Sequence, residues 1–229
     1  MMASGYFSEA TFNYLASLAK NNNRDWFSVH KQQYEAVVRN PALDFIADMS
    51  YELVKISPHF LAIPKTVGGS LMRIHRDVRF GKDKRPYKTN VGIQFRHVLG
   101  KDVHAPGFYV HLEPEGCFVG VGLWRPESPV LRKIRNSIVE KPDSWKKVKK
   151  DKKFNQYFSL EGDSLVNPPR GFPKEHPMLI DLKRKDFIAF SPLTDASVCS
   201  ARFKAQVCQR FNVSVPFMQF LCKSLELNF

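Results

Sequence analysis

The sequence predicts an α+β protein in which a mostly antiparallel central sheet packs against N- and C-terminal helices. Apolar residues recur at helical spacing before residue 57 and after residue 128, whereas residues 71–124 alternate apolar and polar side chains. Period-3.6 segments on either side of period-2 segments are typical of helices packed on one face of a sheet. We therefore expect about four strands, one short late strand, and a single domain over residues 1–229.

Three helices are expected before the sheet. Ser8 and Asn23 suit the N-cap position, because their side-chain oxygens can accept hydrogen bonds from the first turn of a helix. Asn40 followed by Pro41 predicts the start of a third helix, since proline is favoured at the first helical position. We expect this helix to end at Ser57.

The strands are expected in the middle of the chain, where alternate side chains point to opposite faces of a sheet. Their predicted ranges are residues 71–80, 91–96, 108–113 and 117–124. Arg76 falls on the apolar side of the first strand, so it needs a buried partner or a bulge there. Gly120 and Gly122 share one face of the fourth strand and are expected to leave a flat, open patch.

Helical spacing returns after the sheet and alternates with loops. We expect a helix from Ser128, a lysine-rich helical segment at residues 141–153, an irregular loop at residues 167–173, a short buried strand at residues 186–191, a helix around Phe203 to Phe211 and a last helix beginning at Pro216.

The charge balance is strongly basic. The chain has 35 lysine and arginine residues against 22 aspartate and glutamate residues, a formal net charge of +13. Such a surplus attracts nucleic acid, anionic membrane surfaces and phosphorylated metabolites. A generally basic surface with solvated lysines explains the same number. Apolar residues make up 43% of the chain, enough for a substantial core, and this argues against extensive disorder.

The cysteines and apolar runs exclude several classes of protein. Four cysteines without a CxxC spacing indicate neither a disulfide framework nor a zinc site, and reduced thiols favour the cytoplasm. No apolar run approaches the ~18 residues of a membrane span, so none is expected. The start of the chain lacks the pattern of a secretory signal. No motif indicates a cofactor, and the oligomeric state is not specified.

The densest cluster of charge lies in residues 71–90, hereafter the basic segment. Its seven cations are Arg73, Arg76, Arg79, Lys82, Lys84, Arg85 and Lys88. Charge-assisted donors beside a glycine, hydroxyls and a side-chain amide suit a phosphate group, above all in the loop at residues 81–90. The P-loop pattern is absent. The alternative is that the cations pair with Asp77, Asp83 and Glu113 and fasten the loop to the sheet.

A second candidate site lies on the polar faces of two predicted strands. His75 and Asp77 alternate on one strand, and His111 and Glu113 alternate with Tyr109 on another. If both strands share a sheet face, these residues would supply the acid and base of general acid–base catalysis. An exposed polar face with balanced charges explains the same pattern. Each pair could also converge on a metal ion, but the flanking cations would repel it, and no metal site is predicted.

Aromatic residues at the start of the second helix allow two interpretations. Trp26 and Phe27 beside Arg24 could stack on a nucleobase. At helical spacing with Tyr34 they are expected in the core instead, with His30 as a hydrogen-bonded packing residue.

Four sequence blocks follow one another along the chain. They are NNNRDWF at residues 21–27, RIHRDVRFGKDKRPYKTN at 73–90, GFYVHLEPEGCFVGVGLW at 107–124 and PPRGFPKEHPMLIDLKRKDFIAF at 168–190. Together they resemble a widespread family of conserved proteins of unknown function from bacteria and fungi. The resemblance covers nearly the whole chain and implies one conserved intracellular domain. It implies no reaction and no catalytic residues.

Two functional hypotheses follow. The first is a module that binds a phosphate-bearing partner, nucleic acid foremost, through the loop at residues 81–90. The second is a small enzyme that holds an anionic metabolite with that loop and acts on it with the His, Asp and Glu side chains of the strands. A deep pocket joining the loop to the strand faces would favour the enzyme.

Overall fold

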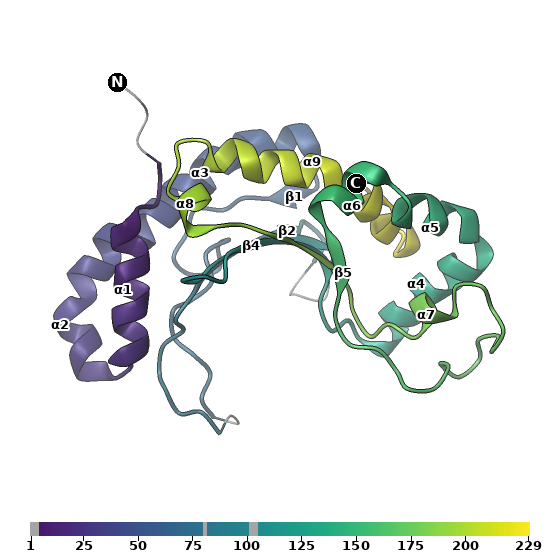
Figure 1. Ribbon diagram of the computed structural model, residues 1–229, viewed down its shortest axis with the longest axis horizontal. Coiled ribbons are helices and arrows are strands. Elements are labelled where there is room, and N and C mark those ends of the chain that lie inside the picture. The colour runs from purple at the N-terminus through teal and green to yellow at the C-terminus, as the bar shows by residue number, and fades with distance from the viewer. Residues whose placement is uncertain (1–4, 80–81, 101–104) are drawn as a thin grey trace.

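The computed structural model describes residues 5–79, 82–100 and 105–229 (Figure 1). It has the predicted α+β architecture, with a six-stranded antiparallel sheet and helices on either side of it along the chain. The helical segments are α1 (Glu9–Lys20), α2 (Arg24–Tyr34), η1 (Glu35–Arg39), α3 (Asn40–Ile56), α4 (Ser128–Glu140), α5 (Pro142–Lys149), α6 (Lys152–Tyr157), α7 (Leu179–Leu182), α8 (Asp195–Val198) and α9 (Phe203–Ser224). The strands are β1 (Phe60–Leu61), β2 (Val91–His97), β3 (Gly107–Leu112), β4 (Phe118–Leu123), β5 (Ser159–Glu161) and β6 (Phe187–Pro192).

The strands lie in the order β1-β2-β3-β4-β6-β5, and every neighbouring pair is antiparallel. Val110 of β3 lies opposite Ile93 of β2 and Val119 of β4, so one face of the sheet is apolar across three strands. Helices α3 and α9 lie over this face (Figure 1). Phe211 of α9 packs against Phe108, with ring centroids 4.5 Å apart. The opposite face is concave (Figure 1) and carries polar and aromatic side chains, among them Tyr109, His111 and Phe118.

The prediction of a regular strand at residues 71–80 is wrong. Only isolated bridges form there, from Leu71 to Ile93 and from His75 to Tyr87, and Phe80 lies outside the described residues. The facing segment contains Pro86, which has no N–H to donate, so an unbroken ladder cannot form. The predicted alternation of side chains does occur, because odd-numbered residues from 73 to 79 are exposed and even-numbered ones are half-buried.

The third helix has the predicted bounds, since α3 begins at Asn40 and ends before Ser57, but Asn40 is not its N-cap, because α2, η1 and α3 form one continuous helix. Pro41 cannot donate to the carbonyl of Val37, and its ring would clash with that carbonyl in a regular α-helix. The chain widens to a π-helical turn just before the proline. The Val37 carbonyl accepts a 2.8 Å hydrogen bond from the Thr11 hydroxyl of α1 instead.

The last helix likewise begins earlier than predicted. Pro216 lies inside α9, which runs unbroken from Phe203 to Ser224. Buried residues on both sides of the proline, among them Phe211 and Phe217, hold the helix against the sheet and offset the local cost of the proline. The very short β1 and β5 were not predicted.

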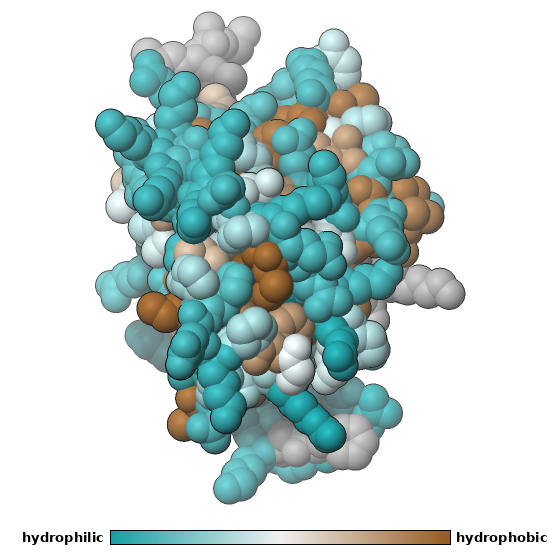
Figure 2. Space-filling model, turned by 90° about the vertical axis from the view of Figure 1, so that its right-hand side faces the viewer, coloured by the Kyte–Doolittle hydropathy of each residue, from teal (hydrophilic) through white to brown (hydrophobic). Residues whose placement is uncertain are grey.

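The side of the molecule that carries α4, α5 and α7 is mostly hydrophilic, with small apolar patches (Figure 2). The lysine-rich segment forms α5 and α6 there, anchored by the buried side chains of Trp145, Val148 and Phe154. All four cysteines are free thiols. Among the described residues, no helix has both the length and the apolar character required to cross a bilayer.

Candidate functional site

Two carboxylates organise the arginines of the basic segment. Asp83 binds Arg76 at 2.5 Å and Arg85 at 2.7 Å, and Asp77 binds Arg79 at 2.7 Å. The Arg79 hydrogen bonds lower the pKa of Asp77 to about 2. Hydrogen bonds from Arg85 and then Arg76 lower the pKa of Asp83. Three of the seven predicted anion-binding cations are thus paired inside the segment.

The other four cations form no ion pair within the part of the chain that the structure describes. Arg73 and Lys82 are exposed, and the ammonium of Lys84 donates to the Val78 carbonyl at 2.9 Å. Lys88 is half-buried, and its pKa is lowered by burial first and by Arg73 second. Four cations of the basic segment thus have no ion pair in the described residues, and Asp77 and Asp83 hold the arginines beside them.

The basic segment is also fastened to the turn between α1 and α2. Asn22 donates to the Tyr87 carbonyl and accepts from the Tyr87 amide, both at 3.0 Å. The ring of Phe27 stacks on Tyr87 with centroids 4.1 Å apart. His75 packs against these two rings, at 6.3 Å from Phe27 and 5.1 Å from Tyr87. The segment is thereby held between the sheet and α2.

A hydrogen-bonded chain runs along the concave face of β3. The Tyr109 hydroxyl lies 3.0 Å from Nδ1 of His111, and Nε2 of His111 lies 3.2 Å from the Glu113 carboxylate. Because a carboxylate can only accept, Nε2 carries the proton, and Nδ1 of the neutral ring accepts from the tyrosine. Burial lowers the pKa of His111 and outweighs the opposing effect of Glu113. Burial and Glu113 raise the pKa of Tyr109 above its usual value.

The end of the basic segment reaches this chain directly. The Thr89 hydroxyl donates to Glu113 at 3.2 Å, and the Asn90 amide lies 3.4 Å from Nδ1 of His111. Tyr109, His111, Glu113, Thr89 and Asn90 are hereafter the His111 network. The sequence indicated a hydroxyl and an amide beside the cations, but their contacts with β3 depend on how the segment folds back and were not predicted.

The four predicted acid–base residues occupy two places. His111 and Glu113 meet in the network, whereas His75 lies among aromatic rings and Asp77 binds Arg79. No hydrogen bond or ring contact joins the two pairs within the described residues. The described residues also contain no group of three His, Cys, Asp or Glu side chains able to hold a metal ion.

Aromatic rings continue from the network across the concave face. Phe118 of β4 stacks on His111 with centroids 4.7 Å apart and contacts Phe190 of β6 at 4.6 Å. The expectation of an open patch is therefore wrong at Gly120. A Cβ atom at that position would lie only 3.4 Å from the Phe190 ring and 3.5 Å from the Tyr109 ring, so these side chains cover the glycine.

A family model described as a conserved hypothetical protein family, DUF2461, matches residues 10–220. The chain belongs to this family. Neither a curated protein sequence nor a solved structure was found to match it. The matched range contains the basic segment, the His111 network, α2 and all of α1 except Glu9, so the site described above lies within the DUF2461 unit.

Proposed function

We propose that the protein binds a phosphate-bearing polyanion, nucleic acid foremost, through the basic segment. The observation that carries this proposal is the division of its seven cations. Three arginines are held by Asp77 and Asp83, while four cations stay without an ion pair in the described residues. Hydrogen bonds and salt bridges already hold the backbone that carries these cations, so less chain freedom is lost when a phosphate backbone binds.

The form of the surface supports a binding module over an enzyme. A hollow of about 390 Å³ lies between α1 and α2, and one of about 180 Å³ lies at the edge of β1 and β2. Neither is lined by a residue of the basic segment or of the His111 network. An enzyme for a small metabolite would favour a pocket that encloses both, whereas a polymer needs only an accessible surface.

The experiment is a titration of the purified protein with labelled oligonucleotides at low salt, where electrostatic attraction is least screened. Single-stranded and double-stranded DNA and RNA of one length should be compared. We expect binding that weakens as salt is added. Absence of binding to every one of these probes at low salt would overturn the proposal.

The His111 network favours a second candidate, an enzyme acting on an anionic metabolite. A neutral histidine held in one tautomer between a tyrosine hydroxyl and a carboxylate can relay a proton. The test is to incubate the protein with pooled phosphorylated metabolites and to follow phosphorus NMR signals. Turnover that His111→Gln abolishes would support catalysis, and unchanged spectra over the pool would argue against it.

The free thiols support a cytoplasmic site of action. Cys117 and Cys222 are buried, and burial raises the pKa of both to about 12, which keeps them as unreactive thiols. Four unpaired cysteines are typical of a reducing compartment. Cell fractionation with an antibody to the protein tests this location.

A further inference from the structure

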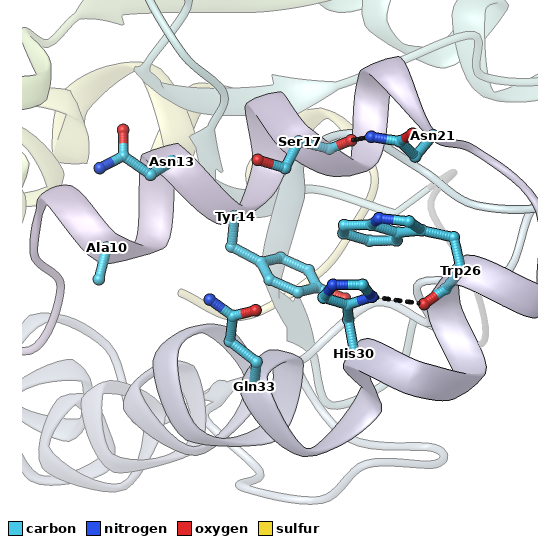
Figure 3. Close-up of a pocket in the computed structure, with 8 residues that line it drawn as sticks. All are labelled: Ala10, Asn13, Tyr14, Ser17, Asn21, Trp26, His30 and Gln33. Carbon is cyan, nitrogen blue, oxygen red and sulfur yellow. Dashed lines mark hydrogen bonds between the residues drawn. The ribbon is translucent and has the colours of Figure 1, made fainter.

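The hollow between α1 and α2 and the hollow at the edge of β1 and β2 differ in charge. The first has no Lys, Arg, Asp or Glu among the described residues that line it (Figure 3). Trp26 and His30 stack on one another there, and Nδ1 of His30 lies 2.8 Å from the Trp26 carbonyl, so His30 is the hydrogen-bonded packing residue that the sequence predicts. The second, hereafter the edge hollow, is lined by the charged side chain of Arg96 and by no described Asp or Glu.

Arg96 forms no ion pair within the parts of the chain that the structure describes. The residue is half-buried, and its hydrogen bond to the Gly69 carbonyl is long, at 3.4 Å from Nη2. Buried nitrogens without a partner occur at Arg135 and Arg184, but Nε and Nη1 of Arg96 are not enclosed in this way and therefore reach solvent. The guanidinium is thus an unpaired cation that a ligand entering the edge hollow can contact.

The register of the sheet explains why this arginine is unpaired. Arg96 lies opposite Leu61 of β1 on one side and opposite Gly107 of β3 on the other. Gly107 in turn lies opposite Gly122 of β4. Side chains directly across neighbouring strands are the ones that pair on a sheet face. This row offers one aliphatic side chain and two glycines, so Arg96 has no acid beside it in the sheet.

The other side chains of the edge hollow are uncharged, and several are apolar. Gln94 precedes Arg96 by two residues on β2, so both side chains lie on the same face of the sheet. The Gln94 amide forms no hydrogen bond among the described residues and offers a donor and an acceptor. Leu61 and Val98 are 39% and 51% exposed, and Ile63 is half-buried. A ligand here meets one positive charge, one amide and three aliphatic side chains.

We infer that the edge hollow binds a carboxylate attached to a short apolar group. A guanidinium matches a carboxylate through two parallel hydrogen bonds, and one cation balances its single charge. The aliphatic side chains suit the apolar group, and a volume of about 180 Å³ limits its size. A small organic acid presents this chemistry, and so does the C-terminal residue of a peptide, which β1 could admit because it is an edge strand. The inference is independent of the proposed function, since no residue of the basic segment lines the edge hollow.

The first experiment titrates the isotope-labelled protein with acetate, propionate and butyrate at neutral pH and follows NMR shifts, including the Nε–H signal of Arg96. Affinity should rise by up to about fourfold for each added CH₂, the value for full burial. Butyramide has the same shape without the charge and should not bind. Arg96→Gln should weaken butyrate about tenfold, because it removes the charge-assisted bonds. The matched control is Arg202→Gln, which removes the same charge from an exposed residue outside the hollow and should leave the affinity unchanged. Both variants should keep the wild-type melting temperature.

The second experiment compares butyrate with acetyl-alanyl-valine, whose C-terminus is either free or amidated. Tighter binding of the free dipeptide assigns the site to a peptide C-terminus, and tighter binding of butyrate assigns it to a free acid. The inference is overturned if no carboxylate probe binds, if Arg96→Gln leaves binding unchanged, or if affinity does not depend on chain length. Inorganic phosphate that binds as tightly as butyrate would also overturn it, because the hollow would then be a general anion site. The butyramide and amidated-dipeptide comparisons use the wild-type protein, so they decide the matter even if Arg96→Gln impairs folding.

Discussion

Replacing both Lys84 and Lys88 with alanine is expected to halve the salt dependence of polyanion binding. The basic segment offers four cations without an ion pair in the described residues, and these two are half of them. A single strand contributes a slope of about −0.7 per phosphate to log Kobs against log[salt]. The wild-type slope should therefore be about −2.8 and that of the double variant about −1.4. Between about 50 and 200 mM salt, affinity should fall about 50-fold for the wild type and about 7-fold for the variant.

The assay is fluorescence anisotropy of a labelled single strand over this range of salt. The matched control replaces Lys147 and Lys153, two exposed lysines of α5 and α6, and removes the same charge. Its slope should stay near the wild-type value. If the control lowers the slope as much as the Lys84/Lys88 variant does, binding follows net charge and the basic segment is not the site. An unchanged slope in the Lys84/Lys88 variant would refute the reasoning directly.

Three further predictions concern the fold and the His111 network. Thr11→Val leaves the Val37 carbonyl without its hydroxyl donor and should destabilise the protein by about 2 kcal/mol in denaturant unfolding, whereas Thr11→Ser, which keeps the hydroxyl, should cost much less. Gly122 has φ +113°, and a Cβ there would lie 2.0 Å from a backbone oxygen of the facing strand; Gly122→Ala should therefore cost more than about 2 kcal/mol, while Gly116→Ala, with no atom nearer than 3.7 Å, should be tolerated. The pKa of His111 should lie below 6.5 in an NMR titration, because burial disfavours its charged form. The folded protein therefore favours the neutral ring, and His111 stabilises the fold at pH values above its unfolded pKa of about 6.5. This stabilisation is lost as the pH falls below about 6.5, so His111→Gln should flatten the decline in stability between about pH 7 and pH 5.

The parts of the fold that follow from local patterns were predictable. β2, β3, β4 and β6 have the alternation or apolar run of half-buried and buried strands, and packing on α3 and α9 agrees with that pattern. The errors at Pro41 and Pro216 have one cause. Each proline favours a helix start by local rules, but distant residues decide the outcome. At Pro41 the Thr11 hydroxyl, on another helix, donates to the Val37 carbonyl that the proline leaves without a donor, and no local pattern reveals this contact.

The candidate site, too, was predictable only where local sequence patterns determine it. The sequence identifies the cations of the basic segment, and it also places His111 and Glu113 on one strand face, where the structure brings them together. It does not specify which arginine each aspartate holds, because that depends on the path of an irregular segment. The junction between Asn22 and Tyr87 joins residues 65 positions apart.

The strand order has a consequence for biosynthesis. β4 pairs on one side with β3, its neighbour in sequence, but on the other side with β6, which begins about 60 residues later. At about 5–20 residues per second, a ribosome needs about 3–12 s to make the intervening chain. During that time the nascent meander of β2, β3 and β4 exposes an unpaired edge, and α9, which covers its apolar face, has not yet been made. The nascent chain is then most exposed to aggregation and to capture by chaperones, and this vulnerability ends only when β6 and α9 have left the ribosome.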